Sequence, residues 1–164
     1  MFARMVVSCA VGLSFGASAN ETLRGVEEVR VVISLEGSKA TGLSEAVLRT
    51  DIELEFRELG LSITGRPSEG YFHLSVLILS MNREGSDEAP SYVYFIRADY
   101  YQRTTIERED VIITSTSSTW QYSGRLGLAD ERIAETVKEI CLHVARSFAN
   151  DYLKANQRPS TPEE

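Results

Sequence analysis

The stretch "LSEAVLRTDIELEFRELG", residues 43–60, decides the fold, because its middle alternates like a β-strand whereas its whole length repeats like an α-helix. Its apolar residues recur at spacings of four, four and three, as on one face of a helix: Leu48, Ile52, Phe56 and Leu59. Ser44 precedes this stripe as a candidate N-cap, and Gly60 follows it where a left-handed C-cap residue belongs. The pattern therefore predicts a helix.

Outside this helix, four segments have the residue pattern of β-strands: 29–37, 71–81, 91–106 and 111–124. A polar loop, 82–90, joins the second strand to the third, and the short turn "ERED" joins the third to the fourth. On the second strand, alternate residues form a drier face: Phe72, Leu74, Val76 and Ile78. The opposite face carries Tyr71, His73, Ser75, Leu77 and Leu79.

The third strand begins with "SYVYFIRADYYQR", residues 91–103, whose side chains separate into two rows when the chain is extended. One row contains no charge and is predicted to face the core: Tyr92, Tyr94, Ile96, Ala98 and Tyr100. The other row is predicted to face outward: Val93, Phe95, Arg97, Asp99, Tyr101 and Arg103. Trp120 and Tyr122 share one face of the fourth strand, and the sequence does not determine which face.

Residues 128–156 form a second amphipathic pattern, with Asp130 as its candidate N-cap and one apolar stripe: Ile133, Val137, Ile140, Val144, Phe148 and Tyr152. The element order is thus β-α-β-β-β-α. Three strands joined by short loops favour an antiparallel meander, and two single-striped helices require a sheet to cover. We predict an α+β two-layer sandwich, in which a four-stranded, mainly antiparallel sheet carries both helices on one face.

The N-terminus has the pattern of a signal peptide. Arg4 precedes an apolar run from Met5 to Phe15, which is too short to span a membrane, and small residues then lead to Ala19. We predict cleavage after Ala19 and a periplasmic or secreted protein. The domain boundaries that follow are a signal peptide over 1–19, one α+β domain over 20–156 and a disordered tail over 157–164.

Composition and residue types exclude several functions. The net charge of −7 argues against a nucleic-acid partner, and no later segment resembles a transmembrane helix. Neither a nucleophile elbow nor a phosphate-binding glycine loop occurs, and no cofactor is expected. Two histidines are too few for a typical zinc site, and Cys141, beside the apolar stripe of 128–156, is expected to be a buried thiol.

Four stretches resemble a family of small exported bacterial proteins of uncharacterised function: "LRTDIELEFRELGL" (48–61), "YVYFIRADYYQ" (92–102), "STWQYSGRLG" (118–127) and "VARSFANDYLKANQ" (144–157). The element order is also similar to that of small envelope-assembly lipoproteins and of the amino-terminal domain of the Tol translocation protein. The resemblance implies a docking role in the cell envelope rather than catalysis. It transfers no site residues.

The leading hypothesis is a non-enzymatic interaction domain that binds a protein partner or a small apolar ligand through the open face of its sheet. The candidate binding residues are Leu77, Leu79, Phe95, Arg97, Asp99, Tyr101 and Arg103. One alternative is a small hydrolase that uses His73 with Asp99, which requires a hydrogen bond between these two side chains. Another is a structural envelope protein that forms a homodimer through the same sheet face.

Overall fold

The elements follow one another in the order β-α-β-β-β-α, as predicted. The computed structural model of the protein describes residues 22–37, 41–66, 70–81, 89–108 and 111–156. The helices and strands within these residues are β1 (Arg30–Glu36), α2 (Glu45–Glu58), β2 (Gly70–Ser80), β3 (Tyr92–Arg108), β4 (Val111–Ala129) and α3 (Ile133–Asn156). The expected signal peptide (1–19) and the expected disordered tail (157–164) lie outside the described residues.

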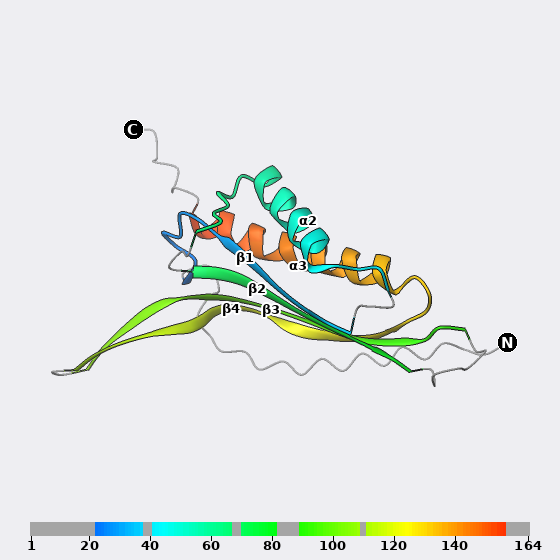
Figure 1. Ribbon diagram of the computed structural model, residues 1–164. Helices are drawn as coiled ribbons and strands as arrows, with labels where there is room; N and C mark the ends of the chain where they lie inside the picture. Colours follow the sequence, from blue (N-terminus) through cyan, green and yellow to red (C-terminus); the bar gives the residue numbers. More distant parts are fainter. Residues whose placement is uncertain (1–21, 38–40, 67–69, 82–88, 109–110, 157–164) are drawn as a thin grey trace.

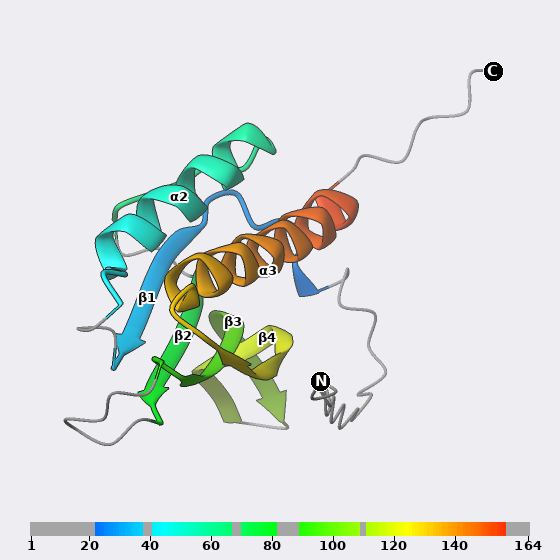
Figure 2. The same cartoon turned by 90° about the vertical axis from the view of Figure 1, so that its right-hand side faces the viewer.

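The four strands form a single sheet in the order β1-β2-β3-β4. β2 and β3 are antiparallel, as are β3 and β4, whereas β1 runs parallel to β2. A parallel pair requires a crossover connection, and α2 provides it. Both helices lie side by side on one face of the sheet, and no described helix or strand covers the opposite face (Figures 1 and 2). The predicted two-layer fold is therefore confirmed.

α2 has the caps that its sequence predicts. The Ser44 hydroxyl accepts a hydrogen bond from the Val47 backbone N–H at 3.3 Å. At the other end Gly60 adopts a φ of 87°, the left-handed conformation that favours glycine. Leu48, Ile52 and Phe56, spaced one turn apart, are fully buried against the sheet and α3. The helical interpretation of residues 43–60 is correct.

The boundary between β4 and α3 differs from the prediction. β4 continues to Ala129 rather than ending at residue 124, and α3 begins at Ile133 rather than at residue 128. Leu126 and Leu128 remain extended because they pair with Phe95 and Val93 of β3. Asp130 then starts the turn into α3, since its carboxylate accepts the Arg132 backbone N–H at 3.0 Å.

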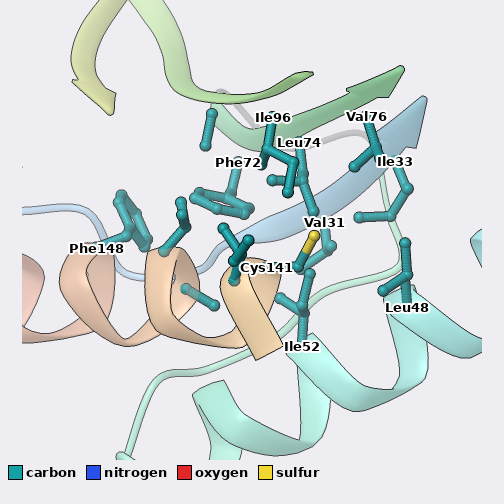
Figure 3. Close-up of a cluster of buried hydrophobic side chains, with 14 of the residues drawn as sticks. Val31, Ile33, Leu48, Ile52, Phe72, Leu74, Val76, Ile96, Cys141 and Phe148 are labelled. Carbon is teal, nitrogen blue, oxygen red and sulfur yellow. The ribbon is translucent and has the colours of Figure 1, made fainter. Parts of the chain in front are cut away.

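The core is centred on Phe148 of α3, which contacts aromatic rings from four other elements. Its ring centroid lies 5.0 Å from that of Phe72, 5.1 Å from Trp120 and 5.2 Å from Tyr100. Phe56 of α2 completes the cluster at 5.6 Å. Figure 3 shows Phe148 on α3 at one end of the core, with aliphatic residues of β1, β2 and α2 farther along it and the Cys141 thiol between the layers. Cys141 is buried, as predicted.

β3 and β4 extend beyond the rest of the sheet as a two-stranded arm. β2 pairs with β3 only from Tyr92 to Gln102, whereas β4 continues to pair with β3 as far as Arg108. Figure 1 shows this arm projecting away from both helices. Side-chain hydroxyls link its two strands; the Thr104 and Ser117 oxygens, for example, are 2.9 Å apart. Within the described part of the chain, no helix has the length and apolarity of a membrane span.

Replacing Phe148 by alanine should lower the free energy of unfolding by about 3–5 kcal/mol, because it leaves a cavity among four rings. Leu54→Ala on α2 is the matched control, since Leu54 is exposed and its truncation should change stability by less than about 1 kcal/mol. Urea titration followed by circular dichroism measures both values. Equal losses in the two variants would contradict the central role of Phe148.

Stability should decrease at alkaline pH. Burial raises the pKa of the Cys141 thiol from 9.0 to about 12 and the pKa of the Tyr100 phenol from 10.0 to about 12. The folded state thus holds these protons more tightly than the unfolded state. Their stabilising contribution is therefore complete below the unfolded pKa values and is lost as the pH rises through the folded ones.

We expect the unfolding free energy to be level near pH 8 and to fall between roughly pH 9 and 12, as measured by urea titration at each pH. A Cys141→Ala/Tyr100→Phe variant should show a shallower decrease over the same interval, because neither group can then ionise. A decrease of the same steepness in both proteins would rule out these two groups as its cause.

Candidate functional site

The face of the sheet opposite the helices carries the side chains that the sequence assigned to it. In the predicted inner row of β3, Tyr92 is partly buried and the other four residues are buried: Tyr94, Ile96, Ala98 and Tyr100. Register shifts occur in the β3–β4 pair between Ile96 and Ala98 and between Tyr100 and Tyr101. In each shift the additional residue lies on β4, so the alternation along β3 continues without interruption. Both predicted rows of β3 are therefore correct.

The shifts also determine the orientation of the aromatic residues of β4. Trp120 and Tyr122 pair with Tyr100 and Ala98 of the inner row and pack on the helix side. The Trp120 indole N–H donates to the Asp151 carboxylate of α3 at 3.0 Å. The two β4 aromatics thus belong to the core and not to the open face.

Six apolar side chains form two parallel rows across three strands of the open face. In the first row Leu77 of β2 pairs with Phe95 of β3, which pairs with Leu126 of β4. In the second row Leu79, Val93 and Leu128 are aligned in the same way. We call these six residues the apolar array. The exposed fractions are 51% for Leu79, 39% for Phe95, 70% for Leu126 and 72% for Leu128, so the array is open to solvent.

Leu126 and Leu128 are the site residues that the sequence interpretation missed, because it placed residue 128 in the last helix and ended the strand before Leu126. A signal was present: Leu126 and Leu128 alternate with Gly127. Glycine is required at this position and at Gly124, because a Cβ atom at Gly127 would clash with the Tyr94 side chain and one at Gly124 would clash with the Phe95 ring. The Phe95 ring therefore rests over bare backbone at Gly124.

A charged network occupies the centre of the open face. The Arg97 guanidinium donates two hydrogen bonds to the Asp99 carboxylate, at 2.8 and 3.0 Å. The Ser118 hydroxyl donates a third at 3.1 Å. Asp99 is only 3% exposed despite its place in the outer row, and its carboxylate raises the pKa of Arg97, first through the hydrogen bond and then through its charge. These partners satisfy Asp99 within the protein.

The hydrogen bond that the hydrolase alternative requires is not formed. His73 and Asp99 are partners in the strand register, but the His73 Nε2 atom lies 2.9 Å from the Ser34 hydroxyl oxygen. The Asp99 carboxylate instead binds Arg97 and Ser118. Consequently Asp99 does not orient the imidazole, and the prediction of a His73–Asp99 pair is wrong. Among the described residues, no group of three His, Cys, Asp or Glu could hold a metal ion.

The remaining predicted residues lie apart from the apolar array. The Tyr101 ring stacks on Tyr71 of β2, with centroids 5.2 Å apart. Arg103 pairs with Thr116 on the arm and lies eight steps of extended strand from Phe95, a distance of about 26 Å. The seven predicted residues therefore divide between the array, the Asp99 network, a tyrosine pair and the arm.

No protein family and no curated protein matches the sequence. The structure is similar to the hypothetical protein CT253 from Chlamydia trachomatis, with 9% identity, a TM-score of 0.44 and coverage of 76% of this chain and 96% of that one. It is also similar to a neuraminyllactose-binding hemagglutinin homolog from Helicobacter pylori, with 11% identity, a TM-score of 0.41 and coverage of 88% of this chain and 91% of that one. A third similar structure is the rare lipoprotein B from Shewanella oneidensis, with 11% identity, a TM-score of 0.36 and coverage of 74% of this chain and 94% of that one. Values this low transfer no ligand, partner or function to this chain.

Asp99→Asn should reduce stability by about 1–2 kcal/mol, because hydrogen bonds to a charged acceptor are stronger than those to an amide and part of this ion pair is exposed. Arg103→Gln is the control on the same strand: Arg103 is exposed and takes part in none of the ion pairs of the described residues. Thermal unfolding of both variants measures the difference. A stability loss in Arg103→Gln equal to that in Asp99→Asn would show that the network contributes nothing specific.

Proposed function

We propose that the protein is an exported, non-enzymatic interaction domain whose apolar array forms the centre of a docking surface for a protein partner. The observation that carries this proposal is the alignment of six apolar side chains in two rows on the uncovered face of the sheet. Along the strands of an antiparallel sheet with one solvated face, the residues that point to that face are normally polar. Contiguous exposed apolar surface in such a position is typical of interaction sites.

The shape and surroundings of the array favour a protein over a small apolar ligand. Small ligands are usually held in concave sites that enclose most of their surface. The array instead lies across neighbouring strands of an open sheet, and Leu126 and Leu128 extend into solvent. Arg97 lies next to the array on β3, and its guanidinium is held in place by the ion pair with Asp99. An apolar centre beside a charged rim is the usual composition of a protein interface.

The arrangement of polar residues supports binding rather than catalysis. Asp99 is engaged by Arg97 and Ser118, and His73 by Ser34, so the described residues of the open face include no carboxylate hydrogen-bonded to an imidazole. Export is supported by the signal-peptide pattern that ends at Ala19. An envelope or secreted location would place the docking surface in contact with other exported proteins.

Substitution of Phe95 and Leu126 by serine should abolish docking without unfolding the protein, because both side chains are largely outside the core. The matched control is Val47→Ser/Leu54→Ser, which removes two exposed apolar side chains from α2 on the other side of the molecule. A photo-crosslinking amino acid at position 128, introduced in exporting cells, should give a discrete protein adduct.

We expect the Phe95→Ser/Leu126→Ser change to remove this adduct and the α2 control to retain it, while circular dichroism shows both variants folded. The proposal fails if the adduct persists in the array variant, or if a crosslinker at position 54 gives the same product. A photolabelled protein without any adduct in cells would equally argue against a protein partner at this face.

A further inference from the structure

The two edges of the sheet differ in how well their backbone groups are protected. At the first edge β1 is only seven residues long, and the Glu45 side chain accepts the Leu35 backbone N–H at 3.2 Å. Val29, just before β1, pairs with the segment that follows α2, through a hydrogen bond of 2.9 Å to the Ser62 carbonyl. This edge therefore offers few free groups to another strand.

The second edge is β4, and its two halves are unlike each other. The half that lies against the body of the sheet contains both register shifts, which bend an edge away from regular pairing. Here the Thr22 hydroxyl also donates to the Thr119 carbonyl at 2.7 Å. The half within the arm, residues 111–118, contains neither device in the described structure. Its described hydrogen bonds all join it to β3 or to other residues of β4.

The sequence of this half, "VIITSTSS", contains no charge, no proline and no glycine. Natural proteins normally protect a long free edge with such residues. Threonine, valine and isoleucine also hold the backbone extended, so the edge is ready to accept a further strand at small entropic cost. Figure 1 shows that both helices lie over the body of the sheet and that neither approaches the arm.

We propose that two copies of this chain pair within residues 111–118 of β4, antiparallel about a two-fold axis at Thr114, to form one continuous sheet. An uncharged strand faces its own copy without the like-charge repulsion that normally prevents self-pairing. With Thr114 on the two-fold axis, Thr114 lies opposite its own copy and Ile113 lies opposite Ser115, so β-branched and hydroxyl side chains meet across the new pair. Because the same uncharged edge lies on both copies, each copy supplies the strand that the other accepts.

The test uses one cross-strand pair of the arm, Thr114 on β4 and its partner Thr105 on β3, which forms the opposite edge of the arm. Sedimentation equilibrium of the purified protein should show a concentration-dependent dimer. Thr114→Lys and Thr114→Glu should each raise the dimer dissociation constant by about tenfold or more, since like charges then meet across the two-fold axis. Thr105→Lys adds the same charge at the same level of the arm but on the opposite edge, and should leave the constant within about threefold of wild type.

Mixing the Thr114→Lys and Thr114→Glu proteins in equal amounts should restore dimers, which unfolding of either variant could not do. Hydrogen exchange should also slow at the amides of 111–118 as the concentration of the wild-type protein increases. A monomer at all concentrations overturns the proposal, as does equal weakening by Thr105→Lys or a mixture that remains monomeric. A dimer that is lost with Phe95→Ser/Leu126→Ser but retained with Thr114→Lys would place self-association at the array instead.

Discussion

Burial of two helices against the same face of one sheet is the constraint on which the other features of this protein depend. Phe148 shows how it works: one side chain of α3 contacts rings from α2, β2, β3 and β4, so the helix layer and the sheet share a single aromatic core. Because both apolar helix stripes are satisfied on that side, no described helix remains to cover the other. The open face, including its apolar side chains, is therefore a direct consequence of how the core is built.

The register shifts of β4 reconcile this core with the open face. Additional residues on β4 leave β3 regular, so a single strand can present Tyr100 inward and Phe95 outward along its whole length. The same shifts turn Trp120 toward α3 while Leu126 and Leu128 point away from it. Glycine at positions 124 and 127 leaves space for the rings of the neighbouring strand. The array thus depends on irregularities that β4 absorbs.

Features that follow from the local helix or strand periodicity of the sequence could be predicted. Features that depend on which distant segments pair with each other could not. The stripe from Leu48 to Phe56 and the two rows of β3 are local patterns, and both were predicted correctly. The end of β4 was not, because Leu126 and Leu128 are held extended by Phe95 and Val93, which lie far away in the chain. The burial of Asp99 likewise depends on Ser118, and the parallel pairing of β1 depends on the path of α2. Long-range partners, rather than propensity, determine these features.

The array and the free edge lie at opposite ends of β3, and the separation allows both to be used at once. In an antiparallel pair that continues a sheet, the two-fold axis is perpendicular to the sheet. The same face of each copy therefore points in the same direction. Pairing through 111–118 would therefore place two apolar arrays on one side of an eight-stranded sheet. Two linked sites bind a partner that carries two matching sites more tightly than either site alone. Self-association would then strengthen docking without adding any contact to the array.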